Sequence, residues 1–246
     1  MTAPFLSIVI PAHNEEYRLP PSLQKIHTFI QSQPYTVEVL VIENGSHDRT
    51  VKVAHDFARQ APYLRVISET QRGKGLAVRR GMLEARGEYR FICDADLSMP
   101  IDQVNRFLPP NLTQREIIIG SREISGAVRY HEPAYRHFIG RGFNSIVRWM
   151  ALPGLQDTQC GYKCFSARAA ENVFSRQSLT GMSFDVEVLF IARQLGYEIQ
   201  EVPIDWYFDP DSRVRLFKDS LAMFLDLLTI RRNARQGYYG PPVRSR

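Results

Sequence analysis

Two β-branched apolar runs decide the fold: Leu6-Ser-Ile-Val-Ile10 and Val37-Glu-Val-Leu-Val-Ile42. Each has the length and composition of a buried strand. Between them, residues 15–33 carry apolar side chains at helical intervals, namely Leu19, Leu23, Ile26 and Ile30. The opening of the chain is therefore expected to fold as strand, helix and strand.

The same alternation continues through the first half of the chain. Apolar runs predict strands at residues 64–67, 89–93 and 116–120, and helices are expected over residues 48–57 and 75–85. Strands that alternate with helices pair in parallel through right-handed crossovers. We therefore expect an α/β fold with a Rossmann-like, mostly parallel central sheet flanked by helices.

Polar residues follow three of the predicted strands, at residues 11–16, 43–46 and 94–96. Ligands bind parallel sheets beyond the carboxyl ends of the strands, so chemistry is expected there. Asp94-Ala-Asp96 supplies two carboxylates, and hard oxygen ligands of this kind suit Mg²⁺ or Mn²⁺ bridging a diphosphate. A solvated turn is the alternative, because aspartate is common after strands.

The pattern changes in the second half of the chain. Residues 126–133 predict a turn-rich loop, and residues 134–150 predict a helix. Because no low-complexity linker interrupts the sequence, residues 1–235 are expected to form one domain. The Gly, Pro and Arg content of residues 236–246 predicts a loose basic tail.

Composition narrows the possible partners. The 246 residues carry a formal net charge of +5, which suits nucleic acid, anionic lipid or a phosphorylated substrate. The sequence has no recognisable RNA or DNA motif, so nucleic acid is not expected as a partner. Three cysteines without the spacing of a disulfide framework or a zinc site favour a reducing, cytoplasmic setting. We expect neither a signal peptide nor a membrane span.

Four ordered motifs of the first half closely resemble the family 2 GT-A glycosyltransferases. They lie at residues 5–16, 41–50, 72–75 and 94–98. In the second half, the resemblance is to the dolichyl-phosphate β-glucosyltransferase branch. It is carried by Gly120-Ser-Arg122, Asp157-Thr-Gln-Cys-Gly-Tyr-Lys163, Ser183-Phe-Asp-Val-Glu187 and Ser212-Arg-Val214. The similarity spans about residues 5–232 and implies the GT-A fold.

The resemblance implies a nucleotide-binding half over about residues 1–122. The positions that would surround the base and ribose are Pro11, Ala12, Asn14 and Glu15. Glu43 would lie near the nucleobase, although family members usually have paired aspartates where this chain has Glu43-Asn44. Lys74 would lie near the nucleotide, unless it is only part of an ordinary first helical turn. The segment Asp94-Ala95-Asp96 would hold the diphosphate through the metal.

The resemblance also implies an acceptor-binding half over about residues 123–235. Arg122 and Arg136 match family arginines that flank the acceptor, and a guanidinium can hold phosphate bidentately. Arg213 stands where the branch usually has lysine, and it would also contact anionic ligand. Outside its motif, each arginine would be interpreted as an ordinary surface residue of a chain rich in arginine.

Three acidic residues complete the candidate set. Asp157, Asp185 and Glu187 would recognise sugar hydroxyls or align the acceptor. Asp185 and Glu187 have an alternative role as a capping pair, because Ser183 precedes them at the start of a predicted helix. The catalytic set implied by the resemblance is Asp96, Asp157, Arg122, Arg136 and Asp185.

The implied reaction is an inverting transfer of glucose from UDP-glucose to a dolichyl-type polyprenyl phosphate, giving a β-linked product. Its transition state would resemble an oxocarbenium ion, as in other glycosyl transfers. Three alternatives stay open: a GDP-mannose-dependent polyprenyl-phosphate mannosyltransferase, a family 2 transferase with another acceptor, and a nucleotide-sugar binding module without catalysis.

A membrane contact is expected from residues 216–232. Their apolar side chains fall on one helical face, with arginines at the end: Phe217, Leu221, Phe224, Leu225, Leu228, Arg231, Arg232 and Arg235. This pattern suits a helix lying among anionic headgroups, and equally an amphipathic helix packed on the sheet. With a lipid acceptor, the protein would be peripheral on the cytosolic face of a membrane.

Overall fold

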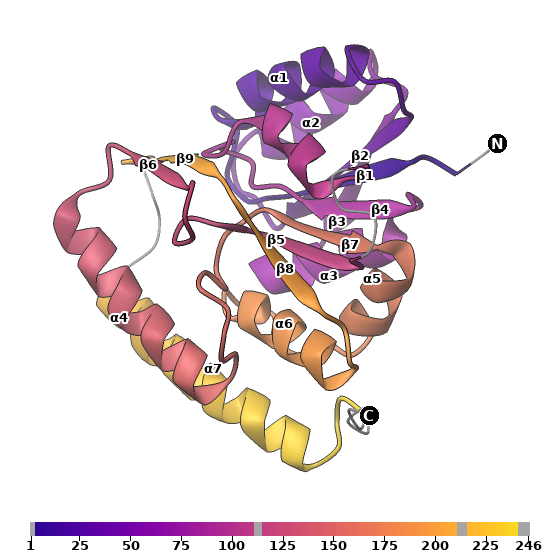
Figure 1. Cartoon of the computed structure of the whole chain (residues 1–246). Helices are drawn as coiled ribbons and strands as arrows, with labels where there is room; N and C mark the ends of the chain where they lie inside the picture. The colour runs from indigo at the N-terminus through magenta and orange to yellow at the C-terminus, as the bar shows by residue number, and fades with distance from the viewer. Residues whose placement is uncertain (1–2, 111–114, 211–215, 241–246) are drawn as a thin grey trace.

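A computed structural model describes residues 3–110, 115–210 and 216–240, and a sheet forms its centre (Figure 1). The strands of this sheet are β1 (Leu6–Ala12), β2 (Val37–Asn44), β3 (Leu64–Glu69), β4 (Tyr89–Ile92), β5 (Ile117–Ser121), β7 (Lys163–Ser166) and β8 (Ile199–Pro203). Within the described ranges their spatial order is β3-β2-β1-β4-β7-β5-β8. The predicted strands of the first half are thus confirmed.

The sheet is parallel except at one strand. β7 runs antiparallel to both β4 and β5, whereas the other neighbouring strands pair in parallel. Lys163 at the start of β7 pairs with Ile92 at the end of β4. The predicted mostly parallel α/β fold is confirmed, and the chain segment that precedes β7 arrives at the carboxyl ends of the parallel strands.

Helices cover both faces of the sheet. One face carries α1 (Leu19–Gln31), α2 (Thr50–Ala58) and the short 3₁₀ helix η1 (Ile101–Phe107), and the other carries α3 (Lys74–Glu84), α5 (Ala167–Phe174) and α6 (Phe184–Gln194). Alternate residues of β1 serve the two faces, because successive side chains of a strand point in opposite directions. Ile8 and Ile10 pack with α1, and Val9 packs with α3.

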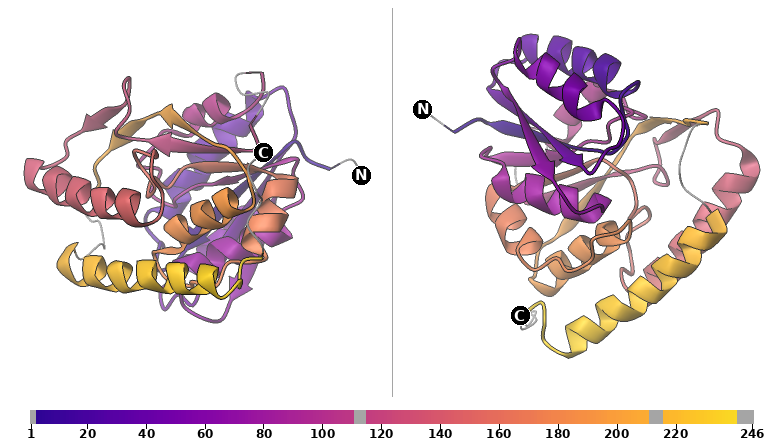
Figure 2. Two further views of the ribbon diagram at one scale, coloured as in Figure 1. Left: turned by 60° about the horizontal axis from the view of Figure 1, so that its bottom comes forward. Right: turned by 180° about the vertical axis from the view of Figure 1, so that it is seen from behind.

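Two long helices, α4 (Ala134–Met150) and α7 (Leu216–Arg235), run side by side beyond the sheet (Figures 1 and 2). Leu227 and Ile230 of α7 are buried in the same core as α6. Phe224, Leu225 and Leu228 face away and are exposed. Among the described residues, none of the helices has both the length and the apolar character needed to cross a membrane.

Two features of the second half differ from expectation. The predicted loop at residues 126–133 contains β6 (Val128–Tyr130), which pairs in parallel with β9 (Asp205–Tyr207). The expected loose tail is wrong over residues 236–240, because Tyr239 is fully buried and its hydroxyl donates a hydrogen bond to Glu187 at 2.7 Å. Residues 241–246 lie outside the described residues.

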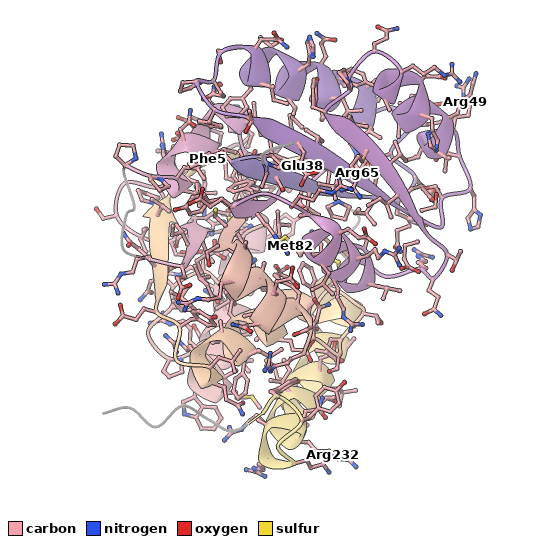
Figure 3. All side chains as sticks on the ribbon, turned by 90° about the vertical axis from the view of Figure 1, so that its right-hand side faces the viewer. Phe5, Glu38, Arg49, Arg65, Met82 and Arg232 are labelled. Atoms are coloured by element: carbon pink, nitrogen blue, oxygen red, sulfur yellow. The ribbon has the colours of Figure 1, made fainter. Side chains whose placement is uncertain are left out.

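Buried polar contacts lie at the rim where the parallel strands begin, opposite the rim at their carboxyl ends. Glu38, near the start of β2, accepts a hydrogen bond from the Ser7 hydroxyl at 2.6 Å and lies 3.5 Å from Arg65. Figure 3 shows Glu38 and Arg65 side by side near Phe5, far from Arg232 on α7. Polar groups at this rim therefore satisfy one another and hold strands together.

Candidate active site

The predicted carboxylate pair lies in the loop that follows β4. The Oδ1 atom of Asp94 is 2.7 Å from the Nζ atom of Lys74, the first residue of α3, and about a quarter of each side chain is exposed. The Oδ1 atom of Asp96 accepts a hydrogen bond from the Ser98 amide at 2.9 Å. Lys74 and Asp94 thus meet at the carboxyl rim of the sheet, as expected for residues that share one ligand.

The two carboxyl groups have opposite electrostatic tendencies. Burial works to raise the pKa of Asp94, but the nearby Lys74 ammonium outweighs it and holds that pKa below its ordinary value. Burial, followed by the charge of Asp94, raises the pKa of Asp96. A pair of crowded carboxylates with few other donors fits a hard divalent cation. The described ranges contain no group of three or more His, Cys, Asp or Glu residues arranged for a metal.

The loop after β2 is fixed by short side chains. The Glu43 carboxylate is buried and accepts a hydrogen bond from the Ser46 amide. The Asn44 amide donates to the Gln71 carbonyl at 2.6 Å, and its oxygen accepts from the Gly73 amide at 2.7 Å. Asn44 therefore connects the end of β2 to the turn that presents Lys74, a role that the sequence did not reveal.

The residues expected around the base and ribose follow β1. Pro11 and Ala12 are its last residues, so the strand extends further than predicted. Asn14 adopts a left-handed φ of 55°, which asparagine tolerates, and its side-chain oxygen accepts from the His47 amide at 2.8 Å. The loops after β1 and β2 are thereby joined into one surface.

Glu15 is engaged by a residue that the motif comparison passed over. Its carboxylate receives a two-pronged ion pair from Arg18 at 2.6 and 2.7 Å, and Arg18 also reaches Asp209 at 3.0 Å. Ala95, between the two aspartates, is buried and contributes only its backbone to the rim. The contact between Arg18 and Asp209 had no signal in the sequence, because Asp209 is far away along the chain.

The acceptor-side candidates Arg122 and Asp157 form a bidentate ion pair. The Nε and Nη2 atoms of Arg122 lie 2.7 and 3.0 Å from the Asp157 carboxylate, which also accepts from the Arg122 amide. Burial opposes ionisation of Asp157, but Arg122 outweighs it and lowers the pKa of Asp157 to about 2. Asp157 is therefore held by the Arg122 guanidinium.

Glu201 of β8 supports this ion pair from behind. Its carboxylate accepts hydrogen bonds from the backbone amides of Gln156 and Asp157 at 2.8 and 2.9 Å. Sequence reasoning missed Glu201, because a glutamate in a polar edge strand resembles any solvated residue. Trp206 was also missed, and its ring lies 5.4 Å from the Arg122 guanidinium and 5.7 Å from that of Arg129.

The segment before β7 packs directly on the carboxylate pair. A Cβ atom at Gly161 would overlap the Oδ2 atom of Asp94, so the position requires glycine while Asp94 stays in place. Two residues later, Lys163 is fully buried, and its ammonium contacts Asp185 and the Cys160 carbonyl, both at 2.5 Å. Asp185 is thus brought to the same region, where it holds Lys163.

The alternative role of Asp185 and Glu187 as a capping pair at the start of α6 is wrong in detail. Ser183 does precede α6, but its hydroxyl donates to Asp226 of α7 at 2.6 Å and makes no capping bond. The fully buried Glu187 accepts from the amides of Ser178 and Leu179. Its role in the fold is therefore to hold the loop that leads into α6.

Two predicted site residues cannot be placed in this geometry. Arg136 lies in α4, but its side chain is outside the described part of the structure, and Arg213 lies wholly outside the described residues. The structure therefore brings together Lys74, Asp94 and Asp96 on one side and Arg122 with Asp157 on the other.

Comparison with known proteins identifies the class of this site. A family model described as glycosyl transferase family 2 matches residues 7–174. Proteins of mouse and human named dolichyl-phosphate beta-glucosyltransferase are 35% and 34% identical over 241 residues, which cover 92% of this chain and 74% of each relative. A Trichomonas vaginalis protein with that activity in its name is 31% identical, covering 92% of this chain and 70% of the relative.

A solved structure shares the fold. The glucosyl-3-phosphoglycerate synthase of Mycobacterium tuberculosis in complex with UDP aligns with a TM-score of 0.63 at 21% identity, covering 92% of this chain and 80% of that chain. The chain therefore belongs to glycosyl transferase family 2. It is a glycosyltransferase with the GT-A fold, as the ordered motifs of its first half predict.

Proposed function

We propose that the protein transfers glucose from UDP-glucose to a dolichyl-type polyprenyl phosphate and inverts the configuration at the anomeric carbon. The observation that carries the proposal is the meeting of a carboxylate pair and an arginine-containing acceptor side at one rim of the sheet. Relatives named dolichyl-phosphate beta-glucosyltransferase, which match 92% of the chain, support the choice of donor sugar and acceptor.

Asp94 and Asp96 are the proposed ligands of a divalent cation, Mg²⁺ or Mn²⁺. Structures of the Mycobacterium tuberculosis synthase with Mn²⁺ and UDP-glucose, and with Mg²⁺ and UDP, support this assignment. When bound, such a cation neutralises charge on the diphosphate as it leaves the sugar. Because Lys74 pairs with Asp94 at 2.7 Å, its ammonium is already positioned to contact an anionic oxygen of the donor.

The remaining chemistry requires orientation more than proton removal. A phosphate monoester is largely ionised near neutral pH, so its oxygen attacks the anomeric carbon without a strong general base. The attack comes from the face opposite the leaving diphosphate, which converts an α-linked donor into a β-linked product. Arg122, held by Asp157, is the proposed cation that orients the attacking phosphate.

Helix α7 is the proposed contact with the cytosolic face of the membrane. Leu225 and Leu228 are 56% and 45% exposed and, with the exposed Phe224, belong to the predicted apolar face, while Leu227 and Ile230 pack inward. Arg231 and Arg232 are exposed at the next turn and would meet anionic headgroups. This exposure favours the interfacial role of the face over packing on the sheet.

The test is a transfer assay with a panel of donors and acceptors. The full chain would be incubated with UDP-glucose or GDP-mannose and a short polyprenyl phosphate, with Mg²⁺, with Mn²⁺ or with a chelator. We expect transfer only from UDP-glucose, abolished by chelation, and a β-linkage in the product by NMR. Transfer from GDP-mannose alone, or to a soluble sugar alone, would replace the proposal with one of its alternatives.

A further inference from the structure

Two hollows lie against one face of α4, and two side chains of this helix line both of them. The smaller, of about 80 Å³, lies between α4 and the Arg122–Asp157 ion pair and is also lined by Gln159. The larger, of about 340 Å³, runs along α4 and is lined by His137, Arg141, Gly142 and Ser145. His137 and Arg141 contribute to both linings. The hollows are therefore neighbours, with Arg141 at their boundary.

The charges that line the smaller hollow are paired, with one exception. Arg122 is held by Asp157. Arg129 is held by Glu123 and also by Glu132, at 2.7 Å from the latter. In the described part of the chain, no carboxylate lies within ion-pair distance of the Arg141 guanidinium. The three arginines and three carboxylates of this lining balance one another, but two of the carboxylates are taken by Arg129, so the hydrogen-bond donors of Arg141 are left open to an anionic ligand.

Arg122, which lines the same hollow, carries a further hydrogen-bond donor. The Arg122 guanidinium uses its Nε and Nη2 atoms for Asp157, and among the described residues its Nη1 atom has no acceptor. Guanidinium groups bind phosphate in a planar, two-pronged geometry. Two guanidinium groups that line one small cavity are therefore suited to bind the oxygen atoms of one phosphate.

Two glycines keep the space beside Arg141 clear. Among the described residues, a Cβ atom added at Gly140 or at Gly142 would meet no atom within 4 Å, although both glycines lie inside α4. Glycine inside a helix is less favourable than alanine, so helix stability does not explain why glycine occupies these two positions. Gly140 lines the smaller hollow and Gly142 the larger one.

We propose that Arg141 binds the phosphate of the acceptor in the smaller hollow, and that the apolar chain next to this phosphate lies in the larger hollow. This inference rests on the proposed function for the identity of the acceptor. Arg141 was not among the residues that the sequence motifs indicated. It acts together with Arg122, since the two guanidinium groups line the same small cavity.

The test compares Arg141→Gln with Arg148→Gln. Both changes remove one arginine charge from α4, but Arg148 lines neither hollow. For Arg141→Gln we expect the KM for a short polyprenyl phosphate to rise about 10- to 100-fold, as for the loss of a charge-assisted hydrogen bond. The KM for UDP-glucose should stay unchanged, Arg141→Lys should recover part of the loss, and Arg148→Gln should match the wild type.

Phosphate binding can also be measured without turnover. Trp206 becomes the single tryptophan in a Trp149→Phe background, and its ring lies beside Arg122. Titration with inorganic phosphate should change its fluorescence, and Arg141→Gln should weaken that response about 10-fold or more. Gly140→Leu should block the same response by filling the smaller hollow, whereas Gly142→Leu should spare it and impair only the polyprenyl acceptor.

The outcomes separate this inference from the proposed function. If the wild type transfers glucose to polyprenyl phosphate and Arg141→Gln has the same acceptor KM as Arg148→Gln, Arg141 is not an acceptor ligand. An equal rise in the KM for UDP-glucose would also overturn the inference. If the wild type makes no lipid-linked product but binds inorganic phosphate through Arg141, the anion site stands and the proposed acceptor does not.

Discussion

The two sides of the candidate active site are built by different kinds of contact. On the nucleotide side, short polar side chains bind nearby backbone groups, as Asn44 does with Gln71 and Gly73. On the acceptor side, long charged side chains bind one another, as Arg122 does with Asp157 and Arg129 with Glu132. The donor site is therefore shaped by the backbone of the sheet, and the acceptor site by a balance of charges beside exposed helices.

This difference explains how the two sides should respond to mutation. A surface shaped by the backbone keeps its form unless a residue at the rim of the sheet is changed. Single substitutions at the rim should therefore change the rate of the reaction. Charge-built surfaces depend on pairs, so changes there should alter affinity, pH dependence and stability. The following changes test that division, beginning with the largest expected effect.

Asp96→Asn should reduce glucose transfer most. It removes one of two proposed metal-ligand carboxylates, and loss of a group that stabilises developing charge lowers kcat by about 10²–10³-fold. The thermal unfolding midpoint should change little, since within the described residues the hydrogen bonds of Asp96 go to Ser98, two residues away. Asp102→Asn, at an exposed position in the following 3₁₀ helix, is the matched control and should keep full activity. Equal activity of Asp96→Asn and wild type would remove the metal role.

Gly161→Ala should have the next largest effect. The added Cβ atom would occupy the position of the Asp94 Oδ2 atom, so the carboxylate must turn away from Lys74. Displacement of a reacting group by about 1 Å costs roughly 10²-fold in rate. Steady-state kinetics should show this loss with little change in the KM for the acceptor, and Gly181→Ala, which adds a methyl group where no described atom lies within 4 Å, is the control. A fully active Gly161→Ala variant would mean that Asp94 needs no fixed orientation.

Leu225→Ser with Leu228→Ser should weaken membrane association by about 10-fold or more, because each exposed leucine contributes apolar area to an interface. Co-sedimentation with vesicles of mixed neutral and anionic lipids measures the change, and the double isoleucine variant is the control. The unfolding free energy should stay near that of the wild type, since both side chains are exposed. Unaltered sedimentation would show that α7 faces something other than lipid.

The Asp157 ion pair predicts a modest dependence of stability on pH. Its pKa is lowered to about 2, below an ordinary value near 3.8, so its contribution is present at neutral pH and is lost as the pH falls below about 4. Between pH 6 and pH 3 this carboxyl group should account for about 1 kcal/mol of lost unfolding free energy. Urea unfolding of wild type and Asp157→Asn at both pH values measures it. Identical pH slopes for the two proteins would contradict the pairing.

The sequence predicted the positions at the carboxyl ends of β1, β2 and β4 well, for a physical reason. Strands β1 and β2 are buried on both faces, so their apolar runs are continuous, and the polar residues that end them stand out. Asp94 and Asp96 were placed at the correct rim because they follow β4 directly. The contact between Lys74 and Asp94 follows from the same topology, since α3 starts at that rim.

The pairings on the proposed acceptor side escaped prediction because they join distant residues. Glu201 lies 44 residues from the Asp157 amide that it binds, and no local pattern announces such a pair. The four-residue strand β7 begins with Lys163, whose fully buried ammonium meets the Asp185 carboxylate, 22 residues away, in the folded state. Its antiparallel direction was likewise invisible, since parallel pairing was inferred from the alternation of strands and helices in the first half.

The reversed direction of β7 has a consequence for which parts of the chain can vary. Its incoming end, at Lys163, lies beside the end of β4, so the connection that enters the strand becomes part of the catalytic rim. Its outgoing end, at Ser166, lies beside Tyr89 at the distant rim. A single inverted strand therefore makes the loop before it intolerant of insertion and sends the chain away from the sugar, into α5 at the distant rim.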